Sequence, residues 1–226
     1  MNKKSSWFRL RMLVILAMLG LLAACGGGSG TSNDTAPPGT PPSTPEVPAP
    51  PSPLTTPPIT PVGAGELKSA TELKTVTAAE IAAALAAGDG RAKGFTPVYS
   101  VKTYRLEYLT SDADGLPVRA SGLVAVPVKA AGAKSPLLSY QHATTFRDAE
   151  VPSNNAVASE VSVVLASLGF IVAAPDYVGY GVSKGTAHPY LLGAPSGAAV
   201  VDFLTASDTW RRANGVIDNG QLFLTG

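Results

Sequence analysis

The residue types that a nucleophilic hydrolase uses occur close together in one stretch of this chain: Asp176, Ser183 and His188. Ser183 is the central residue of the segment 181–185, GVSKG, which matches the G-x-S-x-G pattern of a serine raised on a sharp strand-to-helix turn. A serine attacks a carbonyl carbon when a histidine takes its proton and a carboxylate orients that histidine. These three residues are therefore one candidate catalytic set for acyl transfer.

The surroundings of Ser183 argue against that set. The pattern should follow a strand directly, but residues 175–180 separate it from the apolar run that ends at Ala174. It should also open a helix, and Pro189 disfavours the helical conformation in the residue before it. We therefore interpret the stretch as a loop that lines a site, and keep the Ser183 set as an alternative. The candidate substrate contacts on this loop are Tyr177, Tyr180 and Tyr190.

The elements that would position such a site alternate between strands and helices. Apolar runs and helical spacing predict, in order, a strand at 137–141, a helix at 155–168, a strand at 170–174, a helix at 195–205 and a strand at 222–224. Alternation of this kind indicates a parallel sheet with helices on its faces. Ligands of such sheets bind at the carboxyl ends of the strands.

The pattern before residue 136 is different. Thr77 and Glu80 form a capping box ahead of an alanine-rich run, which predicts a helix over 77–87. The segments 98–110 and 118–126 flank a polar turn and predict an antiparallel β-hairpin. The predicted fold class is α/β, with a mostly parallel sheet and an N-terminal antiparallel hairpin.

The last residues, 221–226, are a short apolar run, QLFLTG, that follows a turn at Asn219 and Gly220. A run of this kind, bounded by turn residues, predicts a buried parallel strand. Its final residue is Gly226, and a glycine at the end of a buried strand is where a G-x-S-x-G nucleophile turn can begin.

In the order and spacing of these segments, residues 98–226 resemble the N-terminal part of an α/β-hydrolase of the secreted lipase and esterase branch. The segment 140–145, YQHATT, resembles the histidine-glycine oxyanion loop of that family, and Gly226 resembles the first glycine of its nucleophile turn. The resemblance implies an α/β-hydrolase-like sheet that is incomplete at its C-terminal end. It also implies hydrolysis of carboxylic esters by a triad whose nucleophile, acid and base lie beyond Gly226, so the printed chain should be inactive alone.

The oxyanion loop is where the resemblance assigns roles to residues of this chain. Acyl transfer builds negative charge on the carbonyl oxygen, which preorganised N–H donors stabilise. The resemblance implies that the backbone N–H of Ala143 or Thr144 is one such donor, although the family's usual glycine is alanine at 143. It implies that His142 shapes the loop and contacts substrate, because in this family the catalytic base comes last in the chain. A purely local structural role for His142 stays open.

The start of the chain has the layout of an export signal. Basic residues precede an apolar run at 12–22 that is short for a membrane span, and the tetrapeptide LAAC ending at Cys25 resembles a bacterial lipobox. The resemblance implies cleavage before Cys25 and lipidation of its sulfur. The proline-rich residues that follow predict an extended spacer. The expected parts are a signal peptide at 1–24, the lipidated cysteine and linker at 25–62, and the N-terminal part of a hydrolase domain at 63–226.

Composition and charge exclude several classes of function. A content of 45% hydrophobic and 15% charged residues indicates a globular chain, and a net charge of +1 without a basic patch argues against nucleic acid as a partner. Cys25 is the only cysteine and cannot form an internal disulfide. His142 and His188 have no cysteine near them, so there is no zinc pattern, and we expect neither a metal nor a cofactor.

These observations together predict an exported bacterial lipoprotein, anchored in the outer membrane or at the cell surface through Cys25. Its expected partners are a small-molecule or lipid ester and the membrane. Two other functions stay open: a non-catalytic binding module on a hydrolase-like scaffold, and a peptidase of the same fold.

Overall fold

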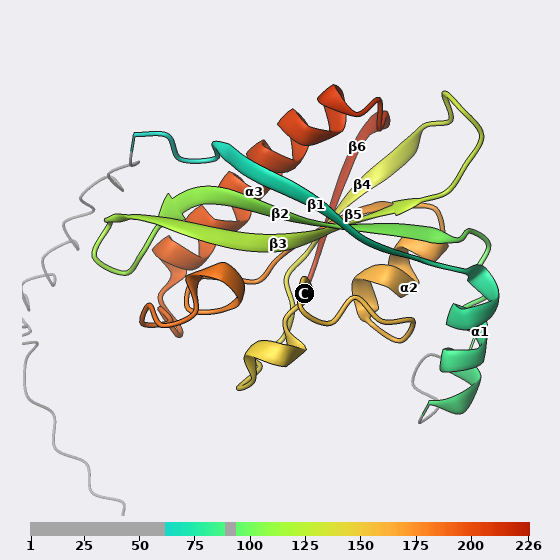
Figure 1. Cartoon of the computed structure of the whole chain (residues 1–226), viewed down its shortest axis with the longest axis horizontal. Coiled ribbons are helices and arrows are strands. Elements are labelled where there is room, and N and C mark those ends of the chain that lie inside the picture. Colours follow the sequence, from blue (N-terminus) through green and yellow to red (C-terminus); the bar gives the residue numbers. More distant parts are fainter. Residues whose placement is uncertain (1–61, 89–93) are drawn as a thin grey trace, which may run out of the picture. The chain divides into compact units, whose positions relative to one another are not determined.

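The structure, a computed structural model, describes residues 62–88 and 94–226. They contain a six-stranded sheet in the order β1-β2-β3-β5-β4-β6 (Figure 1). The strands are β1 (Leu67–Val76), β2 (Val101–Ser111), β3 (Pro117–Pro127), β4 (Ser135–Tyr140), β5 (Ile171–Pro175) and β6 (Asp218–Thr225). The pairs β1–β2, β2–β3 and β3–β5 are antiparallel, whereas β4 pairs in parallel with both β5 and β6. The predicted fold class, an α/β sheet with an N-terminal antiparallel hairpin, is confirmed.

The hairpin of β2 and β3 pairs without interruption from Val101 opposite Pro127 to Ser111 opposite Pro117. Its turn is closed by Asp112, whose Oδ1 accepts hydrogen bonds from the N–H groups of Asp114 at 3.0 Å and Leu116 at 2.9 Å. The first strand, β1, has no counterpart among the predicted elements. Most of its side chains are exposed, so it lacks the alternation that marks a half-buried strand, and its pairing with β2 defines it.

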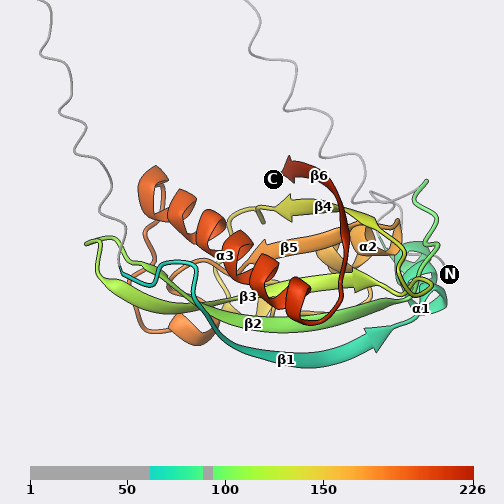
Figure 2. The same ribbon diagram turned by 90° about the horizontal axis from the view of Figure 1, so that it is seen from above.

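Helices cover both faces of the sheet (Figures 1 and 2). The helices are α1 (Ala78–Ala87), α2 (Val161–Ser167) and α3 (Gly193–Ala213). Successive residues of β5 point to opposite faces, so Val172 packs with α1 and α2 in one hydrophobic cluster, while Ile171 and Ala173 pack with α3 in another. The core therefore has two layers, one on each side of β5.

Two predicted helices have different bounds in the structure. The helix predicted at 155–168 begins only at Val161, because the Glu160 carboxylate caps it by accepting a hydrogen bond from the Val163 N–H at 3.1 Å. The preceding residues form turns that leave Val157 exposed. The helix predicted at 195–205 runs on to Ala213, because later residues such as Trp210 continue its buried face.

The last strand was predicted to be parallel and buried, and the first prediction is correct whereas the second is wrong. β6 pairs in parallel with β4, with Leu222 beside Leu137 and Thr225 beside Tyr140. However, Leu222 and Leu224 are 52% and 68% exposed. Among the described residues, β6 lies at the edge of the sheet and has β4 as its only neighbour.

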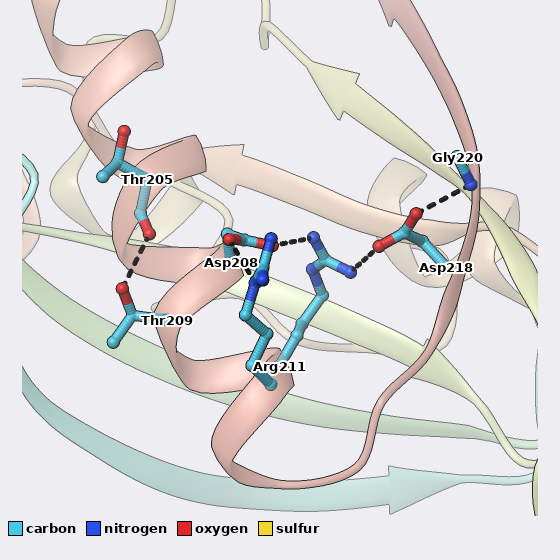
Figure 3. A network of polar contacts seen from close by, with 7 residues as sticks. Thr205, Asp208, Thr209, Arg211, Asp218 and Gly220 are labelled. Carbon is cyan, nitrogen blue, oxygen red and sulfur yellow. Dashed lines mark hydrogen bonds and ion pairs between the residues drawn. The ribbon is translucent and has the colours of Figure 1, made fainter.

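A network of ion pairs fixes the entry of the chain into β6 (Figure 3). The buried guanidinium of Arg211, near the end of α3, donates to Asp208 Oδ1 at 2.9 Å and to Asp218 Oδ2 at 2.6 Å. The other oxygen of Asp218 accepts a hydrogen bond from the Gly220 N–H at 2.8 Å. The hydrogen bond from Arg211 is the main cause of a lowered pKa at Asp218. These contacts tie the start of β6 to α3.

Candidate functional site

The carboxyl ends of β4, β5 and β6 lie at one edge of the sheet, because these three strands are parallel. The Gln141 N–H donates to the Thr225 carbonyl oxygen at 2.8 Å, and a Cβ added to Gly226 would lie 3.0 Å from the Gln141 carbonyl oxygen. The end of β6 therefore lies beside the start of the predicted oxyanion loop.

A cavity of about 230 Å³ opens between the loops that follow β4 and β5. We call it the aromatic cavity, and its lining residues include the two expected N–H donors and the four expected substrate contacts. These are Ala143, Thr144, His142, Tyr177, Tyr180 and Tyr190, and His188 lines it as well. The structure thus gathers residues from two loops that are well separated in the sequence.

A second cavity of about 300 Å³ has residues 142–145 in its lining too. Its remaining lining is more acidic and includes Glu150 and Glu160, together with Asn155. The loop at 142–145 therefore lines two cavities of different chemistry.

Polar contacts connect residues 145–148, which follow β4, to the loop after β5. The Tyr180 hydroxyl donates to the Thr145 carbonyl oxygen at 2.6 Å, and the Gly181 N–H donates to Asp148 Oδ1 at 2.7 Å. Lys184 Nζ lies 3.4 Å from the other oxygen of Asp148. Each loop therefore restrains the position of the other.

His142 is held by its own loop and by the residue that follows β5. Its Nδ1 lies 2.8 Å from the Ala143 carbonyl oxygen and its Nε2 lies 3.4 Å from the Asp176 carbonyl oxygen. Its ring also contacts that of Tyr177 edge-on, with centroids 5.0 Å apart. Within the described residues, no hydrogen bond uses the N–H of Ala143 or Thr144, and both residues are exposed. Ala143 and Thr144 line both cavities, so their N–H groups are candidate donors to a ligand.

The structure does not bring Asp176, Ser183 and His188 together as a catalytic set. The buried Ser183 hydroxyl donates to the Tyr180 carbonyl oxygen at 2.7 Å and accepts from the Gly179 N–H at 3.0 Å. His188 Nδ1 lies 2.7 Å from the Val178 carbonyl oxygen. In the part of the chain that is described, no hydrogen bond joins any two of the three side chains. Ser183 instead closes the short 3-10 turn η2 (Gly181–Ser183) in which it lies.

Asp176 is the centre of a buried polar network under the site. Its Oδ2 accepts from the hydroxyls of Ser121 at 2.6 Å and Ser153 at 2.5 Å, and its Oδ1 accepts from the Ser153 N–H at 2.8 Å. Arg105 Nε donates to the Ser153 hydroxyl oxygen at 3.0 Å. Burial raises the pKa of Asp176, and these hydrogen bonds oppose the rise. Ser121, Ser153 and Arg105 were not predicted as site residues, because they belong to no motif.

Glu160 is a second buried carboxylate, and it lines the acidic cavity. Burial raises its pKa to about 7, although hydrogen bonds from Val163 and Ser162 act in the opposite direction.

No group of three or more metal-binding side chains occurs within residues 62–88 and 94–226.

The free energy of unfolding is expected to fall as the pH rises from about 4.5 to about 7, the unfolded and folded pKa values of Glu160. In this window the folded protein retains a proton that the unfolded chain has lost, so raising the pH favours unfolding. The effect can reach about 3 kcal/mol.

Urea titrations at several pH values test this, with Glu160→Gln as the variant, because a glutamine carbonyl can still cap Val163. The variant should lose part of the pH dependence, while the matched exposed variant Glu150→Gln should keep it. Asp176 contributes in the same direction, so the measured quantity is the difference between variant and parent. Equal pH profiles for the parent and Glu160→Gln would contradict the prediction.

No protein-family model and no curated protein sequence matches the chain. Solved structures are similar to it. A Legionella pneumophila protein classed as a hydrolase superposes with a TM-score of 0.63 and 27% sequence identity, over 70% of this chain and 43% of its own. A ligand-bound form of the rice cell wall degrading esterase LipA from Xanthomonas oryzae gives a TM-score of 0.61 and 26% identity, over 71% of this chain and 42% of its own. The chain spans less than half the length of each of these proteins.

Proposed function

The chain belongs to the α/β-hydrolase superfamily, and from this premise we propose that it is part of a serine hydrolase that cleaves carboxylic esters. The observation that carries the proposal is the loop at 142–145. Among the described residues, none accepts a hydrogen bond from the N–H of Ala143 or Thr144, and this loop lines both cavities and begins beside the end of β6. The similarity to an esterase supports the choice of reaction.

In this proposal the nucleophile, the acid and the base are supplied by residues that follow Gly226 in the full protein. Gly226 lies against Gln141, so a residue placed soon after it would be close to the N–H groups of Ala143 and Thr144. Such a serine would attack the ester carbonyl carbon and form a tetrahedral oxyanion. The intermediate would release the alcohol and leave an acyl-enzyme, which water then hydrolyses.

The residues of this chain would act on that reaction through position and charge. The N–H of Ala143 or Thr144 would stabilise the oxyanion, and one such donor is commonly worth about 3 kcal/mol of barrier. His142 would keep the loop in shape, while Tyr177, Tyr180 and Tyr190 would contact the substrate.

The proposal is tested with the protein expressed from its complete reading frame. A fluorophosphonate probe should label one serine located after Gly226, and hydrolysis of 4-nitrophenyl acetate should stop when that serine is replaced by alanine. Ser183→Ala should still be labelled. Ala143→Pro, which removes the N–H, should lower kcat by roughly 100-fold if Ala143 is the donor, whereas Ala143→Gly keeps the N–H and most of the rate.

Three results would overturn the proposal. Labelling of Ser183 would restore the alternative catalytic set. Absence of both labelling and turnover would favour the non-catalytic binding module. Cleavage of peptides in preference to esters would indicate a peptidase of the same fold.

We also propose that the protein is exported and tethered through Cys25, with residues 1–24 as the signal, 25–62 as the lipid-bearing linker and 63–226 in the hydrolase domain. Cys25 and nearly all of the linker lie outside the described residues. Within the described ranges, no helix has both the length and the apolar character to cross a membrane. Cys25→Ser should abolish incorporation of labelled palmitate and release the protein from the membrane fraction, and retention of both would refute the tether.

A further inference from the structure

Aromatic side chains dominate the wall of the aromatic cavity. The rings of Tyr180 and His188 have centroids 4.9 Å apart at an interplanar angle of 57°, and the His188 and Tyr190 rings are 6.1 Å apart. His142 and Tyr177 form a separate pair at 65°. Tilted pairs of this kind are a favoured arrangement of aromatic rings, so a ring that enters the cavity can extend the cluster.

Among the described residues, those that line this cavity include no Asp, Glu, Lys or Arg, in contrast to the neighbouring cavity with its two glutamates. Its volume of about 230 Å³ fits one six-membered ring with a short substituent, since a cavity of roughly 150 Å³ can hold benzene. It is therefore matched to a single neutral ring and not to a charged group.

Backbone strain is concentrated at the same place. Within the described ranges, two non-glycine residues have a positive φ, Tyr177 at 66° and Leu191 at 62°, and both line this cavity. Such conformations are unfavourable for bulky residues and cluster at ligand sites, where the surrounding structure enforces them.

The tyrosine hydroxyls of the cavity differ in whether they have a hydrogen-bond partner. The Tyr180 hydroxyl is occupied by the Thr145 carbonyl oxygen. In the described part of the chain, the hydroxyls of Tyr177 and Tyr190 take part in no hydrogen bond, and Tyr177 is half-buried. A half-buried hydroxyl without a partner can recognise a polar group on a ligand.

We propose that the aromatic cavity binds a neutral aromatic ring that bears a hydroxyl group. Resting on the proposed function, this defines the substrate class as esters that carry a phenolic ring next to the ester bond. The aromatic lining favours an aromatic ring over a saturated one. The hydroxyls of Tyr177 and Tyr190, which have no hydrogen-bond partner among the described residues, select a ring with a polar substituent.

The test is a binding titration followed by ligand-observed NMR, with the protein expressed from its complete reading frame. The probes are 4-methylphenol, toluene, which lacks the hydroxyl, and 4-methylcyclohexanol, which lacks the aromatic ring. We expect 4-methylphenol to bind about three- to tenfold more tightly than either of the other two. Equal affinity for 4-methylphenol and 4-methylcyclohexanol would overturn the proposal.

Two variants assign the binding to this cavity. Tyr177→Phe should reduce the preference for 4-methylphenol over toluene about threefold or more, and Tyr190→Leu, at an exposed position, should weaken binding of both aromatic probes. Tyr99→Phe, at a tyrosine outside the cavity, should change neither. Unchanged affinities in both cavity variants would place the binding elsewhere and refute the proposal.

The two proposals can fail independently. If a serine after Gly226 is labelled but the phenol preference is absent, the esterase function stands and the substrate class is wrong. If the preference and its loss in Tyr177→Phe are observed but no serine is labelled, the cavity assignment stands and the catalytic proposal is wrong.

Discussion

Replacing Gly181 with alanine is expected to lower the free energy of unfolding by roughly 3–5 kcal/mol, the combined cost of strain and overpacking. The glycine has φ of 58°, and an added Cβ would lie 2.6 Å from Asp176 Oδ2 and closer still to the Ser121 hydroxyl oxygen. Neither neighbour can move freely, because the two are hydrogen-bonded to each other in a buried network. The extra atom therefore has to displace that network or the turn η2.

Gly185 provides a matched control in the same GVSKG segment. Its φ is 102°, and a Cβ added there meets no atom within 4 Å. Gly185→Ala therefore carries the backbone strain without the clash, and it should cost only about 1–2 kcal/mol. Urea unfolding of both variants, in the protein expressed from its complete reading frame, gives the comparison. An equal decrease in the free energy of unfolding of the two variants would mean that the Asp176 network rearranges at little cost. The explanation given for Gly181 would then be wrong.

The second large effect is expected for Asp176→Asn, which should lower the free energy of unfolding by about 2–4 kcal/mol. An asparagine keeps the shape but replaces one acceptor oxygen with a donor, which then faces the hydroxyls of Ser121 and Ser153. The change also removes a negative charge near Arg105, whose Nε donates to the same Ser153 hydroxyl that donates to Asp176. Asp114→Asn, at an exposed turn position, should stay within about 0.5 kcal/mol of the parent.

The same substitution should affect the loop at 142–145, because the backbone of Asp176 contacts His142. Amide hydrogen exchange at Ala143 and Thr144 should become faster in Asp176→Asn and stay unchanged in Asp114→Asn. A variant that loses stability while the exchange of these two amides is unaffected would show that the network supports the fold alone.

Features that depend on residues close in sequence were predictable from the sequence. The capping box of α1 is an example, since the Thr77 hydroxyl accepts from the Glu80 N–H at 3.2 Å and the Glu80 carboxylate accepts from the Thr77 N–H at 2.7 Å. The hairpin and the alternation of later elements are of the same kind. The gathering of residues 142–144 with Tyr177 and Tyr180 in one cavity also follows, because loops after adjacent parallel strands emerge at the same edge.

Only the tertiary structure decided which polar residues are buried together. Asp176 bonds to Ser153 and Ser121, which lie 23 and 55 positions away, and no local pattern marks either serine. The same holds for Ser183, whose motif predicts an exposed nucleophile but whose hydroxyl is buried in its own turn. It also holds for β1 and for the exposed β6, whose environments are set by their neighbours in the sheet. A sequence motif specifies local backbone geometry, whereas burial and hydrogen-bond partners depend on distant segments that meet only when the sheet is assembled.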